Sequence, residues 1–265
     1  STSPNYAIMA SCDVSSAMME APSGEILTGE SIEEAIAFRQ VISRMNSEMR
    51  KGDDWFFSCW QPPLVSVDGA QVPFHEVDAN TLKTEPECWV LHPNEVWHGF
   101  GDIEEGYCML DPIKVSVLSP GMGDDGNLLD FGIPACVLTA YLGRQGIVVE
   151  KTTDFTILFL FSIGITKGKW GTLVNALLDF KRDYDSNLEL ELCLPDLLTA
   201  NQQRYAGMGL KDLAEDIFIA MKKNRTTATM AQAFGMLPQA EYSPVEAYEK
   251  LVRNEVELVT LEEAA

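Results

Sequence analysis

Residues 155–163 read Phe-Thr-Ile-Leu-Phe-Leu-Phe-Ser-Ile and begin the longest apolar run of the chain. The run is about half as long as the ~20 apolar residues that span a bilayer, so it predicts a strand. Strands that are apolar at nearly every position have both faces covered. We therefore expect this segment at the centre of a sheet, with packing on both sides.

The segments around this strand predict a compact α+β layer. Residues 113–118 alternate like a strand, and residues 147–150 indicate a second, shorter strand. Helical spacing predicts helices over 132–146, with Pro134 in the first turn, and over 167–184. The order strand, helix, strand, strand, helix is typical of a sheet with a layer of helices packed against it.

The rest of the chain is expected to be largely helical. A first helix is predicted over 5–20, and a second begins near Thr28 with Ser31 and Glu34 as a capping box. This second helix is expected to end at Gly52. The other expected elements are a strand over 55–60, a turn-rich surface insertion over 66–87, helices near 210–222, 226–235 and 244–254, and a last strand over 256–260.

Composition narrows the classes of partner. The chain carries 19 Lys and Arg against 40 Asp and Glu, which gives a formal net charge of −21. Nucleic acids and anionic membrane surfaces are bound through clustered basic residues, so we expect neither as a partner. The six cysteines are scattered without a Cys-x-x-Cys pair, which predicts reduced thiols and a cytoplasmic protein. The three histidines lack ligand spacing, and we expect no metal site.

Residues 121–126 match the G-x-G-x-x-G pattern of dinucleotide-binding loops. Two aspartates inside the loop would repel a pyrophosphate, and no helix follows directly, so we interpret the segment as a turn. His98, in Trp-His-Gly-Phe, is interpreted either as a hydrogen-bonded histidine in a packed loop or as a residue near an active-site mouth.

Two short segments carry polar groups that suit ligands. Glu150 and Asp154 flank the end of a predicted strand, where a carboxylate could pair with an ammonium or guanidinium group. The alternative for Glu150 is a solvated surface pair with Lys151. The hydroxyls of residues 1–3, directly before a helix, suit either a phosphate or a plain N-cap.

Longer stretches, read together, resemble one family. They are residues 110–115, 120–122, 132–135, 146–152, 158–167 and 180–182. These stretches resemble the bacterial Orn/Lys/Arg decarboxylases, a family that includes the inducible lysine and biodegradative arginine decarboxylases. Members of this family use pyridoxal 5′-phosphate (PLP) and have the aspartate-aminotransferase fold.

The resemblance covers nearly the whole chain and implies a fold of α/β and α+β parts. Residues 1–21 would be the tail of the fold-type-I PLP large domain, and residues 22–265 an incomplete α+β C-terminal domain. The family's Schiff-base lysine lies in a Ser-x-His-Lys motif that does not occur here. Because the chain also starts without Met, we expect a piece of a longer polypeptide that is inactive by itself.

The resemblance also implies roles for individual residues. Ser1, Thr2 and Ser3 match hydroxyls that reach the PLP phosphate of the neighbouring subunit. Glu150 matches a glutamate that lines the substrate site, with a catalytic or substrate-positioning role, and Asp154 is expected beside it in substrate binding. Cues for the lysine and arginine branches conflict, so the substrate stays open among lysine, arginine and ornithine.

The implied activity is decarboxylation of a basic amino acid to its amine and CO₂, with one proton consumed. The implied partners are the small-molecule substrate and a second subunit, in a homodimer with shared active sites and a larger ring of dimers that acid promotes. One alternative is a non-catalytic, acidic assembly or regulatory module derived from the family. A PLP aminotransferase is a further alternative, which the family-specific segments disfavour.

Overall fold

The computed structural model describes residues 4–123, 126–236 and 239–264. The chain divides into two compact units, residues 1–223 and 224–265, and the first contains the sheet and the core. Across the described residues, no helix has both the length and the apolar character that bilayer crossing requires.

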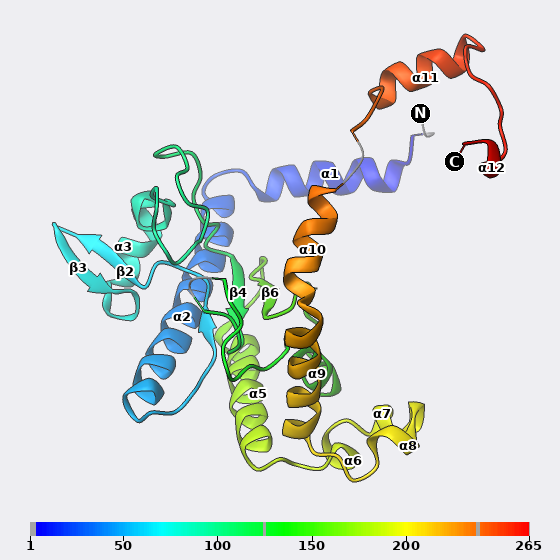
Figure 1. Cartoon of the computed structure of the whole chain (residues 1–265). Helices are drawn as coiled ribbons and strands as arrows, with labels where there is room; N and C mark the ends of the chain where they lie inside the picture. Colours follow the sequence, from blue (N-terminus) through cyan, green and yellow to red (C-terminus); the bar gives the residue numbers. More distant parts are fainter. Residues whose placement is uncertain (1–3, 124–125, 237–238, 265) are drawn as a thin grey trace. The chain divides into compact units, whose positions relative to one another are not determined.

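An antiparallel sheet, four-stranded in the described part of the chain, forms the centre of the first unit (Figure 1). Its strand order is β1-β4-β6-β5, so β6 lies inside the sheet as the sequence predicts. The paired residues of β4 and β6 run from Lys114–Leu160 to Leu118–Thr156. The strands are β1 Ser58–Cys59, β4 Lys114–Leu118, β5 Lys151–Thr152 and β6 Thr156–Leu160.

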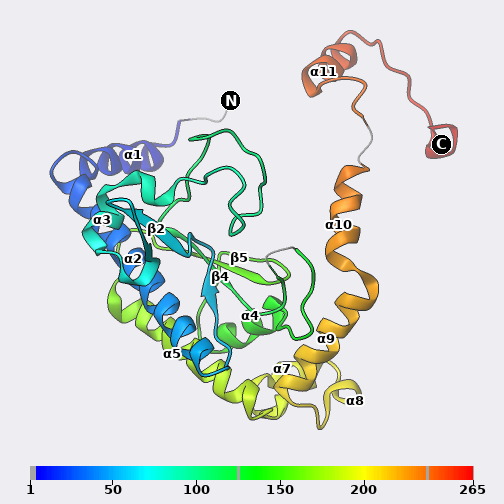
Figure 2. The ribbon, with the colours of Figure 1, turned by 60° about the vertical axis from the view of Figure 1, so that its left-hand side comes forward.

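Three helices cover the buried face of this sheet and complete the larger core. They are α2 Ser23–Lys51, α4 Ala135–Arg144 and α5 Lys167–Asp185. Helices α2 and α5 lie side by side, as both views show (Figures 1 and 2). On β6, Ile157 and Phe159 are buried, whereas Leu158 is half-buried and Leu160 is exposed. The expectation that both faces are covered is therefore wrong, because the helices pack on one face only.

A smaller core lies beside the sheet, on the other side of α2. It is built from an antiparallel hairpin and short helical turns, and its buried side chains include Ile36, Phe74, Leu82 and Trp89. The elements are β2 Leu64–Val67, β3 Ala70–Pro73, η1 Phe74–Glu76, α3 Ala79–Thr84 and η2 Pro86–Trp89. The segment expected as a turn-rich insertion over 66–87 thus has a hairpin and buried residues of its own.

The remaining helices are divided between the two units. In the first unit they are α1 Tyr6–Met18, α6 Leu190–Cys193, α7 Pro195–Ala200, α8 Gln202–Tyr205 and α9 Leu210–Asn224, which ends at the unit boundary. In the second unit they are α10 Thr226–Gly235, α11 Pro244–Val252 and α12 Leu261–Ala264.

Two expectations about helix ends are corrected. Helix α2 begins at Ser23 rather than near Thr28, and the Ser31 hydroxyl donates to the Leu27 carbonyl inside the helix (3.1 Å) instead of capping it. The capping pattern misleads because helix-forming residues precede it. Pro134 is the N-cap of α4 rather than a member of its first turn.

Three expected strands are also corrected. The strand predicted over 55–60 is reduced to β1, and residues 147–150 precede β5 instead of forming it. Residues 256–260 are exposed and form no strand in the described part of the second unit. Short apolar runs of this kind become strands only where a partner strand is available, which local sequence does not show.

One buried cation ties α2 to the sheet. The Arg39 side chain is 0% exposed and its guanidinium donates to backbone carbonyls and one amide of the opposing segments. The acceptors are the carbonyls of Trp60 (3.2 Å), Asp111 (3.5 Å), Pro112 (3.1 Å) and Lys114 (2.9 Å) and Oε1 of Gln61 (3.3 Å). Burial lowers the pKa of Arg39 to about 10, which still leaves it charged at neutral pH.

We predict that Arg39→Met lowers the free energy of unfolding by about 3–5 kcal/mol, since the buried acceptors lose their donor. Chemical denaturation of the chain, followed by far-ultraviolet circular dichroism, measures this. Arg44→Met is the matched control, because Arg44 lies on the same helix with an exposed side chain. Equal midpoints for the two variants would show that the buried hydrogen bonds of Arg39 contribute little.

Candidate functional site: a pocket beside the β5–β6 hairpin

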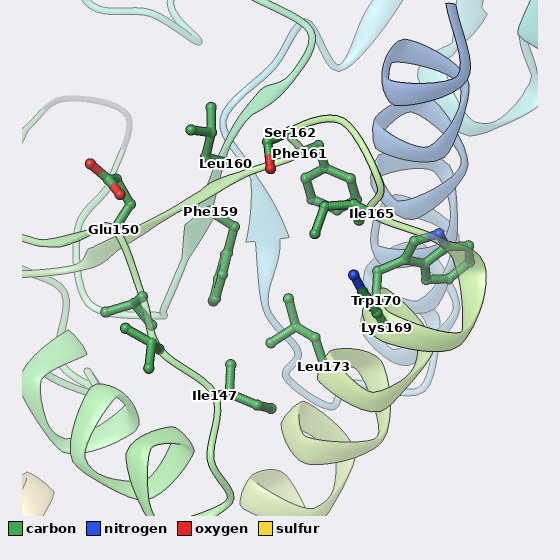
Figure 3. Close-up of a pocket in the computed structure, with 12 residues that line it drawn as sticks. Ile147, Glu150, Phe159, Leu160, Phe161, Ser162, Ile165, Lys169, Trp170 and Leu173 are labelled. Carbon is green, nitrogen blue, oxygen red and sulfur yellow. The ribbon is translucent and has the colours of Figure 1, made fainter. Parts of the chain in front are cut away.

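A cavity of about 370 Å³ lies where β6 leads into α5 (Figure 3). Its walls are mainly apolar, with one carboxylate, one hydroxyl and one ammonium group among them. The lining residues are Ile147, Val148, Val149, Glu150, Phe159, Leu160, Phe161, Ser162, Ile165, Lys169, Trp170 and Leu173.

A tight turn positions the α5 side of this pocket. Gly164 adopts a φ of +86°, a conformation that favours glycine, and the chain then enters α5 at Lys167. The ammonium group of Lys169 reaches back and donates to the Gly164 carbonyl (2.8 Å). This bond fixes the amine of Lys169 against the turn.

The wall opposite Glu150 is aromatic and is held from α2. The Trp170 indole N–H donates to a carboxylate oxygen of Glu34. The Phe38 ring packs on Trp170 with ring centroids 6.0 Å apart and on Phe161 at 5.3 Å. Two residues of α2 that do not line the pocket, Glu34 and Phe38, therefore set the orientation of its aromatic wall.

Glu150 lies at the mouth of the pocket, with an exposed side chain. Its backbone N–H donates to the Leu158 carbonyl (3.0 Å), which continues the pairing of β5 with β6. Figure 3 shows the carboxylate directed away from Phe161 and Trp170. The predicted site residue Glu150 is thus placed beside an apolar cavity and remains accessible to a ligand.

Asp154, the second predicted substrate-binding residue, does not lie at this pocket. It lies in the turn between β5 and β6, which the Thr153 N–H closes by donating to the Thr156 carbonyl (2.9 Å). Its own carbonyl accepts from the N–H of Ala135, at the start of α4 (2.8 Å). Glu150 and Asp154 therefore sit at opposite ends of β5, and Asp154 is not among the residues that line the cavity.

The other sequence candidates are placed as follows. Ser1, Thr2 and Ser3 lie outside the described residues. Gly121 packs against Phe155 so closely that a Cβ would lie 2.3 Å from the ring, which explains a glycine there without a nucleotide. In the described residues, no three His, Cys, Asp or Glu side chains are grouped to hold a metal ion.

His98 is a buried, hydrogen-bonded loop residue. Its Nε2 donates to the His92 carbonyl (2.8 Å), and its Nδ1 accepts from the Phe100 N–H (3.1 Å). We assign the tautomer from these two bonds. Of the two interpretations of this histidine, the geometry favours the packed loop.

The pocket by itself does not fit the phosphate of PLP. Its ammonium group is already bonded to the Gly164 carbonyl, and the carboxylate at its mouth would repel a dianion. Its remaining polar side chain is Ser162, amid apolar walls. The described residues of this pocket suit a ligand with an apolar stem that ends in a cation near Glu150.

The sequence was compared with known families and proteins. A family model described as "Orn/Lys/Arg decarboxylase, major domain" matches residues 1–169. The match crosses the boundary that we predict after residue 21, and that boundary stays a prediction. The biodegradative arginine decarboxylase of Escherichia coli K12 is 49% identical over 98% of this chain and 35% of its own length. Lysine decarboxylase LdcA of Pseudomonas aeruginosa is 45% identical over 98% of this chain and 33% of its own length.

Solved structures agree with these matches. The constitutive lysine decarboxylase of E. coli superposes with a TM-score of 0.80 at 39% identity, over 99% of this chain and 34% of that protein. Lysine decarboxylase A from P. aeruginosa gives 0.80 at 44% identity, over 98% of this chain and 33% of that protein. The chain thus spans about a third of the length of the relatives it matches. The resemblance read from the sequence is confirmed: the chain belongs to the Orn/Lys/Arg decarboxylase family.

Proposed function

We propose that the chain is part of a decarboxylase that converts a basic amino acid (lysine, arginine or ornithine) to its amine and CO₂. The observation that carries this proposal is the match over 98% of this chain to relatives named for arginine and lysine decarboxylation. The pocket at Glu150 gives the proposal a chemical basis, because lysine and arginine have an aliphatic stem that ends in a cation.

In this proposal Glu150 holds the distal cationic group while the apolar wall of the pocket receives the stem. A carboxylate near an ammonium group provides a point charge, whereas a guanidinium can bind both of its oxygens. The apolar residues exclude water from the stem and so favour substrates with several methylene groups. We also propose that the Asp154 carboxylate takes part in substrate binding. Because Asp154 lies at the other end of β5, its role requires a separate test.

We propose PLP as the cofactor, anchored by a lysine outside this chain. When bound, it supplies the electron sink that decarboxylation requires. The hydroxyls of Ser1, Thr2 and Ser3 are proposed to contact the phosphate held by a neighbouring subunit. Such an arrangement requires a homodimer with shared active sites.

A cytoplasmic location is also proposed. The six cysteines are free in the structure, and three of them, Cys59, Cys88 and Cys193, are buried singly in the packed cores. Free thiols of this kind suit a reducing compartment.

We predict that Glu150→Gln, in the complete enzyme that carries this sequence, lowers kcat/KM by roughly 10- to 100-fold. Loss of a hydrogen bond to a charged group costs about 1.5–3 kcal/mol, which corresponds to that range. Assays with lysine, arginine and ornithine measure the effect and identify the preferred substrate.

Two further variants make this test specific. Glu191→Gln, an exposed glutamate of α6, serves as the matched control and should leave the rates unchanged. Asp154→Asn tests the second carboxylate, and a loss similar to that of Glu150→Gln would place it in the substrate site. Wild-type rates for Glu150→Gln on all three substrates would remove Glu150 from the site.

The charge of −21 leads to a prediction about assembly. Because ionised carboxylates on facing subunits repel, we expect the complete enzyme to form larger rings of dimers as pH falls toward carboxylate pKa values near 4. Sedimentation velocity between pH 8 and pH 4.5 measures this. Added salt screens the same repulsion and should promote assembly at pH 8. A mass that changes with neither pH nor salt would rule out charge as the cause.

A further inference from the structure

A long irregular loop covers part of the smaller core. We call residues 92–108 the strap; it follows η2 and contains no helix or strand (Figure 1). Its base is closed by backbone hydrogen bonds from Leu91 N–H to the Cys108 carbonyl (3.1 Å) and from Leu110 N–H to the Trp89 carbonyl (2.8 Å). The strap is therefore anchored at both ends, and a backbone hydrogen bond from Asn94 N–H to the Gly101 carbonyl (2.8 Å) spans its middle.

The inner side of the strap packs on the smaller core. Trp97, Ile103 and Cys108 are half-buried against that core, and the Trp60 indole N–H donates to the Trp97 carbonyl (3.1 Å). The outer side leaves Tyr107 exposed. Opening of the strap would consequently expose the apolar side chains that it now covers.

His92, at the start of the strap, contacts both the end of the strap and η2. Its Nδ1 lies 2.7 Å from a carboxylate oxygen of Glu105, near the end of the strap. Its Nε2 lies 3.6 Å from a carboxylate oxygen of Glu87, in η2. One imidazole thus bridges two carboxylates from two separate segments.

The charges that face His92 in the described structure are all negative. Glu87 comes from η2, and Glu95 and Glu105 come from the strap. The β2–β3 hairpin shares a cavity of about 130 Å³ with His92 and contributes only Leu64, Val65, Ser66 and Gln71, none of them charged. Burial raises the pKa of the neighbouring Cys88 thiol, which therefore stays neutral.

We propose that the protonation state of His92 controls the strap. The protonated imidazole holds the strap closed over the smaller core, and the neutral imidazole lets the strap open. An imidazolium donates from both nitrogens and can satisfy both carboxylates. A neutral imidazole donates from one nitrogen only and presents a lone pair to the other carboxylate. Loss of the proton therefore removes the charge attraction to both carboxylates and leaves at most one hydrogen bond from His92.

The direction of the pH dependence follows from the same contacts. The hydrogen bond to Glu105 is the largest cause that raises the pKa of His92 above its usual value of about 6.5. A raised pKa means that the stabilisation is complete below about pH 6.5 and is lost as pH rises through the higher folded value.

Hydrogen exchange measured on this chain tests the proposal. Protection factors, corrected for the intrinsic pH dependence of exchange, are compared for peptides within the strap and within α5 at pH 6 and pH 8.5. We expect strap protection to fall at least threefold at the higher pH while α5 stays unchanged. In His92→Gln the strap should show the low value at both pH values.

His75→Gln is the matched control, because His75 also faces a glutamate, Glu76 (3.7 Å), but lies in η1 outside the strap. It should retain the wild-type pH profile. Glu105→Gln provides a test that does not alter the histidine: the His92 titration, followed by nuclear magnetic resonance, should move to lower pH. A flat wild-type profile, a pH-dependent His92→Gln, or an unmoved titration in Glu105→Gln would overturn the proposal.

Discussion

The guanidinium of Arg39 is the interaction on which the arrangement of the first unit depends. The guanidinium is fully buried, and its desolvation is offset by carbonyl dipoles from the residue after β1, from the segment before β4 and from the first residue of β4. An arginine suits this position better than a lysine, because its planar fork donates in several fixed directions at once. The orientation of α2 is thereby locked to the sheet.

The locked helix carries the residues that shape the candidate pocket. Glu34 and Phe38 lie within five residues of Arg39 and hold Trp170 and Phe161 of the opposite side. A second polar tie fixes the far end of α5, where the Lys181 ammonium bonds Asp54 (2.9 Å) and Asp185 (2.6 Å). The aromatic wall of the pocket is therefore held by α2, and the Lys181 contacts fix α5 away from the cavity.

The sequence was sufficient for the order and type of the central elements, because each has its own periodicity. The strand predicted over 113–118, the helix over 132–146, the strand over 155–163 and the helix over 167–184 correspond to β4, α4, β6 and α5, whereas the strand predicted over 147–150 ends just before β5. The burial of Arg39 could not be predicted, because nothing in the sequence of α2 marks this arginine as buried. Its hydrogen-bond acceptors lie 21 to 75 residues away along the chain. The bond from Trp170 to Glu34 joins residues 136 positions apart and has no local signal either. Glu150 was singled out by its place at a predicted strand end and by family resemblance, whereas the apolar cavity beside it could come only from the structure.

The exposure of Glu150 sets a requirement for the proposed function. An ion pair between exposed groups contributes ~0–1 kcal/mol, because water screens both charges. Selective binding of a lysine or arginine side chain requires that the carboxylate be desolvated when the ligand is present. The described residues around Glu150 leave its outer side open, so a second surface must cover it. If the neighbouring subunit of the proposed dimer provides that surface, substrate recognition depends on assembly, and conditions that separate the subunits would weaken substrate binding even though Glu150 itself is unchanged.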